Sequence, residues 1–219
     1  MRAKYSHLIW DWNGTLLNDL DWAIASMNRM LKRRGLPEMR SVAAYHAVFG
    51  FPVAEYYRRI GLDLEKEPFS ALANEYMALY HGGDRRHCAL QAGAPEVLRA
   101  AKALGLCQVL LSASERQNLL GQLRFFGAED FFDEVLGVAD VYAAGKTEIG
   151  LRFIERAAPR RALLVGDTKH DFAVAAALGA DCVLFSSGHE SREALLRLGP
   201  PVIGSLGELP AYLREGAAR

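Results

Sequence analysis

The chain has 219 residues, of which 51% are hydrophobic and 24% are charged, a composition typical of globular proteins. Lysine plus arginine and aspartate plus glutamate both number 26, so the formal net charge is zero. This balance gives no electrostatic footprint for nucleic acid or for an anionic membrane. A chain of this length buries a substantial apolar core. We therefore expect a small-molecule partner, with no nucleic acid and no membrane.

The three cysteines, Cys88, Cys107 and Cys182, are odd in number and lack the short spacings of a zinc site or a redox pair. We interpret them as reduced, packed thiols, which predicts a cytoplasmic protein. The apolar run before Asp11 is too short for a signal peptide, and no later run approaches the length of a membrane span.

The first predicted element is a short buried strand, Leu8 to Trp10, which ends at Asp11 and runs into the tight turn at Asn13 and Gly14. Apolar residues then recur at helical spacing among charged ones, and no strand is convincing until the pattern changes near Gly93. The helices predicted in this block are Asp21 to Arg34, Val53 to Ile60 and Pro68 to Tyr80.

Helices and strands alternate through the rest of the chain. The predicted strands are Val109 to Leu111, Glu134 to Val138, Leu163 to Val165, Cys182 to Phe185 and an edge strand at Val202 and Ile203. The predicted helices are Glu96 to Leu104, Gln117 to Phe126, Lys146 to Ala157 and Ala173 to Leu178.

Strands separated by helices imply right-handed crossovers and a parallel sheet that is covered on both faces. The sequence therefore predicts an α/β fold with a doubly wound, Rossmann-like parallel sheet. The helical block interrupts this alternation after the first strand, so we interpret it as an inserted α-helical cap. The predicted boundaries are 1–16 and 89–219 for the catalytic core and 17–88 for the cap.

Polar residues follow several of the predicted strands, at the edge where ligands bind in open parallel sheets. They are Asp11, Ser112, Lys146 and the pair Asp167 and Asp171. Taken singly, each has a simpler interpretation. Ser112 can be a helix N-cap, and Asp167 and Asp171 can serve the start of the next helix. Lys146 follows Gly145 at the start of a predicted helix, although lysines are mostly solvated.

Taken together, these residues have a precedent. The segment Asp11-Trp12-Asn13-Gly14-Thr15-Leu16, followed by Ser112, Lys146 and the Asp167/Asp171 pair, resembles the four ordered motifs of the haloacid dehalogenase superfamily. The resemblance spans nearly the whole chain. The helical insertion after the first motif is similar to that of members with a helical cap, among them phosphoglycolate phosphatases and β-phosphoglucomutases.

The expected chemistry is magnesium-dependent phosphoryl transfer. Asp11 is the candidate nucleophile, which would form an aspartyl-phosphate and split hydrolysis into two steps. Mg²⁺ prefers oxygen ligands, and we assign Asp11, Asp167 and Asp171 to it, the last directly or through water. Lys146 and the hydroxyls of Ser112 and Thr15 are the candidate phosphate ligands. The expected substrate is a small phosphorylated metabolite.

Asn13 departs from the family pattern, in which phosphatases usually carry a second aspartate two residues after the nucleophile. That aspartate acts as acid toward the leaving group and as base toward water, and an amide does neither. Losing general acid–base help typically costs about 10²–10⁴ in rate. The resemblance also implies that this residue binds Mg²⁺ through its backbone carbonyl, which Asn13 retains.

Three interpretations of Asn13 remain open. The protein is a phosphatase with another acid or an activated leaving group, it catalyses a related reaction, or it is a weak or non-enzymatic phosphoryl-ligand binder. Among related reactions, C–P cleavage of the phosphonoacetaldehyde hydrolase type needs a cap lysine, for which Lys32 and Lys66 are the candidates. We expect His170 and His189 to be polar surface residues at the rim, and Arg58 and Arg59 of the cap to be solvated.

Overall fold

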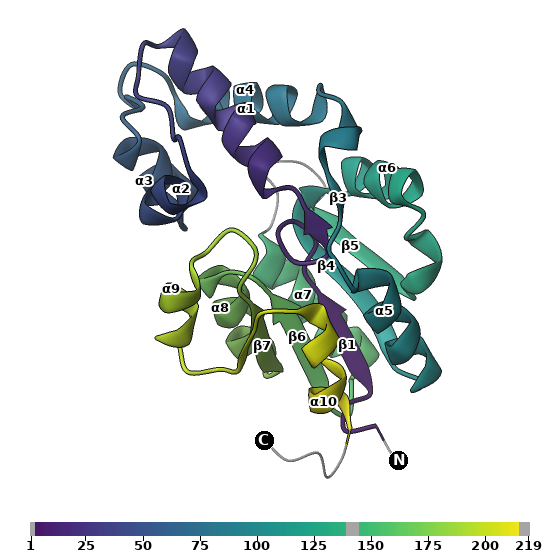
Figure 1. Ribbon diagram of the computed structural model, residues 1–219. Coiled ribbons are helices and arrows are strands. Elements are labelled where there is room, and N and C mark those ends of the chain that lie inside the picture. The colour runs from purple at the N-terminus through teal and green to yellow at the C-terminus, as the bar shows by residue number, and fades with distance from the viewer. Residues whose placement is uncertain (1–2, 139–144, 215–219) are drawn as a thin grey trace.

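The computed structural model describes residues 3–138 and 145–214. Its main sheet has six strands in the order β5-β4-β1-β6-β7-β8, and every neighbouring pair is parallel (Figure 1). The strands are β1 (His7–Trp10), β4 (Cys107–Glu115), β5 (Glu134–Val138), β6 (Ala162–Gly166), β7 (Asp181–Phe185) and β8 (Val202–Ile203).

The strand order identifies the sheet as doubly wound. Counted in chain order, the six strands lie as 3-2-1-4-5-6, the order of the Rossmann arrangement. From β1 the strands first build outward on one side, through β4 to β5. The chain then crosses back to β6 on the other side of β1 and continues outward to β8, so the order of strands reverses at β1. The α/β prediction is therefore confirmed. This reversal is where such sheets bind ligands, beyond the carboxyl ends of the strands.

Helices cover both faces of this sheet. The helices α5 (Ala94–Ala103) and α6 (Arg116–Phe126) pack on one face, and α7 (Lys146–Ala157) and α8 (Lys169–Leu178) pack on the other. Successive residues of a strand point to opposite faces, so Leu8 and Trp10 of β1 join the first core and Ile9 joins the second. Burial on both faces explains why these strands are continuous apolar runs.

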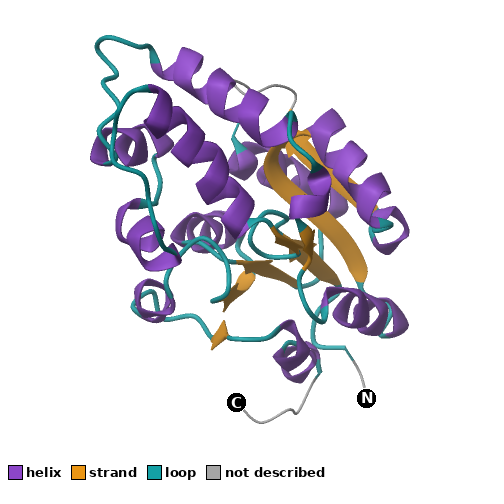
Figure 2. Cartoon of the chain, turned by 45° about the horizontal axis from the view of Figure 1, so that its top comes forward, coloured by secondary structure: helices purple, strands orange, loops and turns teal. Residues whose placement is uncertain are grey.

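The cap consists of four helices: α1 (Leu20–Arg33), α2 (Val42–Val48), α3 (Val53–Arg59) and α4 (Phe69–His81). They stand together above one end of the sheet, and Figure 2 shows the same separation from a second direction. They share a hydrophobic core of their own, which includes Met27, Leu31, Tyr56 and Leu72. The cap is therefore a packed unit and not an extended loop.

The structure adds short elements that the sequence analysis did not predict. The seven-residue helix α2 is one, and its N-cap is Ser41, whose side chain accepts a hydrogen bond from the amide of Ala44. Two further short helices are α9 (Arg192–Leu196) and α10 (Pro210–Leu213), and three 3₁₀ turns are η1 (Arg85–His87), η2 (Glu129–Phe131) and η3 (Leu206–Glu208). Segments this short contain too few turns to display a helical period.

A two-stranded antiparallel ladder joins cap and core. It pairs β2 (Leu17–Asn18) with β3 (Ala89–Leu90), so the expectation of no strand in the block after Asp11 was wrong at Leu17 and Asn18. Two residues per strand carry no detectable alternation, which is why the pattern missed them. The ladder brings both connections between cap and core to one place. The domain boundaries at 16/17 and 88/89 stay a prediction.

The described helices include none that is long and apolar enough to cross a membrane. All three cysteines are free and partly buried. Burial raises the pKa of Cys88 and of Cys182 to about 12, so both stay protonated at neutral pH. This protonation fits the interpretation of these cysteines as packed thiols.

Candidate active site

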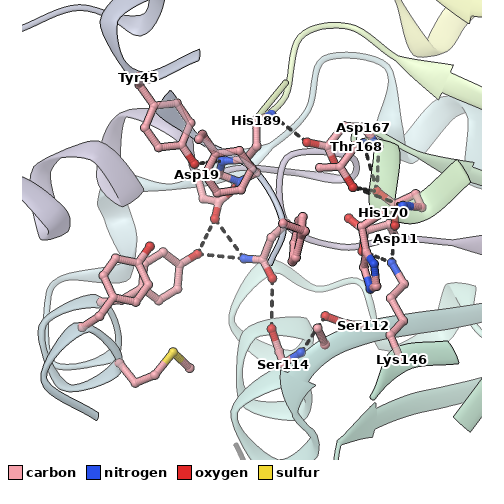
Figure 3. A pocket seen from close by; sticks show the side chains of 18 of the residues that line it. Asp11, Asp19, Tyr45, Ser112, Ser114, Lys146, Asp167, Thr168, His170 and His189 are labelled. Carbon is pink, nitrogen blue, oxygen red and sulfur yellow. Dashed lines mark hydrogen bonds and ion pairs between the residues drawn. The ribbon is translucent and has the colours of Figure 1, made fainter. Parts of the chain in front are cut away.

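Asp11 lies directly after β1, and its amide donates a hydrogen bond to the carbonyl of Val165 on β6 at 2.9 Å. This contact continues the β1–β6 pairing and places the Asp11 side chain at the switch point of the sheet. Here a cavity of about 220 Å³ opens between the sheet and the cap (Figure 3). Its lining includes Asp11, Ser112, Lys146, Asp167 and Asp171.

Three buried carboxylates converge at this position. Asp11, Asp167 and Asp171 each offer an oxygen atom within 4.8 Å of the others. Lys146, which is only 3% exposed, donates to Asp11 Oδ1 and to Asp171 Oδ1, each at 2.5 Å. Lys146 begins α7, and its burial shows that the helix start points it inward. The structure thus brings together four side chains that lie as much as 160 residues apart in the sequence.

The charge of this cluster is unbalanced. Burial raises the pKa of Asp11 to about 6, an effect that Lys146 opposes and Asp171 reinforces. Burial also raises the pKa of Asp167 well above its usual range, with Asp11 and Asp171 adding to the shift. Three carboxylates share one lysine, so a hard cation with oxygen ligands fits the site.

Asp171 also helps to cap the N-terminus of α8. Its Oδ2 accepts hydrogen bonds from the amide and hydroxyl of Thr168, and the Thr168 hydroxyl accepts one from the amide of Asp171. This reciprocal arrangement is a capping box. Burial of Asp171 favours its neutral form, but Lys146 and Thr168 outweigh burial and lower its pKa. The capping and functional interpretations of Asp171 are therefore compatible.

Thr15 contacts the carboxylate cluster from below the cavity lining. Its hydroxyl donates to Asp167 Oδ1 at 2.8 Å, and Thr15 is absent from the cavity lining. Asp167 Oδ2 accepts a hydrogen bond from the amide of His189 at 2.6 Å. Thr15 is fully buried, so its hydroxyl needs a partner, and Asp167 is that partner. Thr15 thus orients Asp167 in this structure, and its expected contact with phosphate stays a prediction.

Ser112 lies within β4, which continues to Glu115 and does not end at Ser112 as expected. Glu115, and not Ser112, is the N-cap of α6, which removes the capping interpretation of Ser112. Its hydroxyl accepts the amide of Ser114 at 3.1 Å, and Ser112 lines the cavity. A hydroxyl has one donor hydrogen, so Ser112 can still donate to a bound oxygen.

Asn13 belongs to a buried polar network that the sequence analysis did not foresee. Its Nδ2 donates to Asp19 Oδ2 and to the hydroxyl oxygen of Tyr80, both at 2.9 Å, and its Oδ1 accepts the Ser114 hydroxyl at 3.0 Å. Asp19 also accepts the amide of Gly14 at 2.8 Å and the hydroxyl of Tyr80 at 2.6 Å. Both polar ends of the Asn13 amide are therefore occupied.

Asp19 is the functional-site residue that sequence reasoning missed. An aspartate directly before a helix is typical of an N-cap, but the Asp19 side chain makes no capping hydrogen bond to α1. The Asp19 side chain instead points toward Asn13 and Gly14, in the loop after β1. Burial disfavours its charge, but His189, Tyr80 and Asn13 outweigh burial and hold the pKa of Asp19 below its usual range. Asp19 is thus a fixed carboxylate beside Asn13.

His189 is buried, so the expectation of a surface histidine was wrong. Its Nε2 lies 3.3 Å from Asp19 Oδ1, and its Nδ1 lies 2.9 Å from the Tyr45 hydroxyl. Burial opposes protonation of His189, but Asp19 outweighs burial and raises the pKa to about 9. His170 lines the cavity and stacks on Phe51 with ring centroids 4.6 Å apart. Both histidines therefore connect the core to the cap.

The cap closes the cavity with aromatic side chains. The cap also contributes Met77, His81 and Asp19 to the lining, and among the described residues it contributes no lysine or arginine. Arg58 is exposed and pairs with Glu55, while Arg59 donates to the carbonyl of Val48, so neither lines the cavity. We use the name aromatic wall for Tyr45, Phe49, Phe51, Tyr76 and Tyr80.

The cap is seated on the core in this structure. His46 Nε2 lies 3.0 Å from the carbonyl oxygen of Gly188, beside the Tyr45–His189 contact. Figure 3 shows Tyr45 of the cap pointing at His189, with Asp11, Asp167 and Lys146 across the cavity. The site is therefore enclosed by core and cap together.

A profile of the haloacid dehalogenase-like hydrolases matches residues 8–185, which is most of the chain. The chain belongs to this family of hydrolases. The match begins within β1 and ends with β7, so it includes Asp11, Lys146 and the acidic pair. The resemblance expected from the four motifs is confirmed.

Individual relatives of this hydrolase agree with the family. A phosphoglycolate phosphatase from Thiobacillus denitrificans is 27% identical over 211 residues, covering 90% of this chain and 91% of the relative. Tyrosine-protein kinase PtkA from Mycobacterium tuberculosis is 27% identical over 185 residues, covering 83% of this chain but only 62% of the kinase. The chain thus spans less than two thirds of the length of that relative.

Solved structures show the same fold. A haloacid dehalogenase-like family hydrolase from Streptococcus pneumoniae superposes with a TM-score of 0.81 at 18% identity, covering 94% of this chain and 97% of that one. This identity is low, so the likeness describes the fold of this hydrolase and not its substrate.

Proposed function

We propose that this hydrolase cleaves small phosphomonoesters in a magnesium-dependent reaction through an aspartyl-phosphate on Asp11. The observation that carries the proposal is the buried cluster of Asp11, Lys146, Asp167 and Asp171 at the switch point of the sheet. An isolated buried carboxylate cluster is costly, so its presence calls for a function. The family supplies that function as hydrolysis.

Each residue has a proposed role. Asp11 attacks phosphorus, Lys146 binds the phosphoryl oxygens as a compact positive charge, and Ser112 donates a hydrogen bond to them. Asp167, Asp171, Asp11 and the backbone carbonyl of Asn13 would hold Mg²⁺. When bound, the ion offsets the negative charge that builds up as a carboxylate approaches a phosphate. The buried oxygen donors of the three aspartates fit this ion.

The geometry gives less support to the two alternatives. C–P cleavage requires a lysine in the cap, but Lys32 and Lys66 are exposed and neither lines the cavity; Lys66 pairs with Asp63. The cap instead supplies rings such as Phe49 and Phe51 to the lining. A non-enzymatic binder would not need the Asp11 carboxylate in the same cluster as Lys146.

The experiment that tests the proposal is steady-state phosphate release from a panel of small phosphomonoesters with Mg²⁺. Turnover of at least one ester supports a phosphohydrolase. Tight binding of phosphate without turnover of any ester, at protein concentrations sufficient to detect slow catalysis, would favour the binder instead.

We expect a strict requirement for a divalent metal ion. Burial and its acidic neighbours raise the pKa of Asp167 well above its usual range, so the cation should be needed to hold its charge. Protein that has been chelated and dialysed should lose turnover, and Mg²⁺ should restore it and raise the melting temperature. Turnover that survives chelation would contradict the metal assignment.

We expect Gly188→Ala to damage the site although Gly188 lies outside the four motifs. A Cβ atom there would lie 2.2 Å from Asp167 Oδ2, so the carboxylate must move. Displacing a positioned group by about 1 Å can cost about 10²-fold in rate, and kcat/KM measures this. Gly204→Ala is the matched control, since its nearest neighbour lies 3.7 Å away. Equal kcat/KM for both variants would contradict the placement of Asp167.

A further inference from the structure

The Asn13 side chain is an amide, which cannot act as a general acid, and its hydrogen bonds hold it in place. The amide donates to Asp19 and Tyr80 and accepts from Ser114, so its polar atoms are engaged. Asp19 in turn receives four donors, from Gly14, Asn13, Tyr80 and His189. A leaving group beside Asn13 therefore meets an amide where a proton donor is expected, which favours a group that departs as a stable anion.

The aromatic wall also favours one kind of leaving group, an uncharged aromatic ring. Among the described residues that line the cavity, Lys146 is the only lysine or arginine, and it already binds Asp11 and Asp171. A substrate with a second anionic group would place that charge against aromatic rings, and His189, the other basic group near it, already pairs with Asp19 at 3.3 Å. A sugar needs hydroxyl partners, and two of the three hydroxyls of the aromatic wall, those of Tyr45 and Tyr80, are already hydrogen-bonded.

The size of the cavity is compatible with a small ring as the leaving group. Its volume is about 220 Å³. An apolar cavity of roughly 150 Å³ accommodates one benzene molecule. The space between the carboxylates and the aromatic wall thus suits a phosphoryl group and one small ring.

Resting on the proposed phosphohydrolase function, we propose that the substrates are small aryl phosphomonoesters, whose ring lies against the aromatic wall. A carboxylate oxygen of Asp11 forms a bond to phosphorus while the P–O(aryl) bond breaks, and its electron pair leaves on the aryloxide oxygen. Water then cleaves the aspartyl-phosphate, which yields phosphate and restores Asp11; the aryloxide takes its proton from solvent. Phenols, like the tyrosine side chain with its pKa of about 10, leave as anions far more readily than sugar alcohols.

Four probes separate the leaving-group argument from the shape argument. Phenyl phosphate has both the ring and the acidic alcohol, and hexafluoroisopropyl phosphate has an alcohol of similar acidity without a ring. Benzyl phosphate has the ring but a weakly acidic alcohol, and phosphoglycolate has a second anion. Acetyl phosphate, which is activated and has no ring, reports whether the phosphohydrolase chemistry operates at all.

We expect kcat/KM for phenyl phosphate to exceed that for hexafluoroisopropyl phosphate about two- to tenfold, because aromatic contacts contribute about 0.5–1.5 kcal/mol beyond area burial. It should exceed benzyl phosphate by about 10²-fold or more, and phosphoglycolate likewise. A phenyl ester no better than the ringless ester, or phosphoglycolate as the better substrate, overturns the aryl assignment while acetyl phosphate turnover preserves the proposed function. Failure of all the esters and of acetyl phosphate overturns both.

Variants of α4 test the aromatic wall directly. Tyr76→Leu should lower the ratio of phenyl to acetyl phosphate kcat/KM at least about fivefold, since the aromatic contact is lost. Phe69→Leu, which removes an exposed ring of the same helix outside the cavity, should leave the ratio unchanged. Met77→Lys gives the cavity a cap cation and should raise phosphoglycolate relative to phenyl phosphate. An unchanged ratio in both Tyr76→Leu and Met77→Lys overturns the placement of the ring.

Discussion

Replacing Asp11 by asparagine should reduce phosphomonoester turnover at least about 10³-fold, because an amide oxygen cannot form the aspartyl-phosphate. Asparagine has nearly the same shape, and Lys146 keeps its ion pair with Asp171 at 2.5 Å. The pKa of Asp11 is raised by burial to about 6, so the ionised carboxylate costs the folded state free energy at pH 7. The Asp11→Asn protein should therefore melt no lower than the wild type.

The two measurements are phosphate release at pH 7 with Mg²⁺ and the melting temperature at pH 7 of the metal-free proteins, where the loss of a proposed metal ligand does not enter. Asp130→Asn is the matched control, since Asp130 is exposed and lies outside the cavity. It should retain normal turnover. Near-normal turnover in Asp11→Asn would remove Asp11 as the nucleophile. A collapse of the melting temperature would instead show that the carboxylate is needed for folding, and the loss of turnover would then carry no mechanistic weight.

The sequence contains enough information to place the core of the site, because each motif follows a buried strand. Asp11 follows β1 and Asp167 follows β6, and parallel strands bring their carboxyl ends to one edge. The apolar runs predict those strands without reference to distant residues. The ends of β4 and the position of α2 were less predictable, since polar Ser112 to Glu115 lacks a strand pattern and seven residues show little helical period.

The cap side of the site depends on tertiary contacts that local patterns do not encode. Asp19 has the sequence context of an N-cap, and only the approach of Tyr80 and His189 explains its orientation. His189 has the context of a polar loop residue, and the packing of Tyr45 on it is what buries it. Thr15 belongs to the first motif, yet its hydroxyl faces Asp167 because the pairing of β1 with β6 brings the turns after these strands together. Residues 143–144, beside Lys146, lie outside the described part of the chain.

Introducing the absent acid by Asn13→Asp should raise kcat/KM for benzyl phosphate, by about tenfold. The gain falls short of a full general-acid contribution of about 10²–10⁴ because the new carboxyl would replace an amide whose nitrogen lies 2.9 Å from Asp19 Oδ2. Two carboxyls at that distance share one proton, which raises the pKa of one of them strongly. The proton of the new carboxyl would then be held by Asp19 and would be slow to reach the leaving group.

The double variant Asn13→Asp/Asp19→Asn exchanges the two groups and removes this competition. The amide at position 19 donates to the carboxyl at position 13, so the hydrogen bond persists with its polarity reversed. We expect a further rise in kcat/KM for benzyl phosphate, to about 10² above wild type, measured by steady-state phosphate release. Asp19→Asn alone is the control and should show no gain, since position 13 remains an amide.

Phenyl phosphate should gain much less than benzyl phosphate in both variants, because a phenolate leaves with little need for a proton. The ratio of the two gains therefore distinguishes a restored acid from a general improvement in folding or metal binding, which would raise both substrates equally. A double variant that is no faster than wild type on benzyl phosphate would show that proton transfer to the leaving group does not limit this hydrolase. In that case Asn13 would act mainly as a hydrogen-bonding link between Asp19, Tyr80 and Ser114.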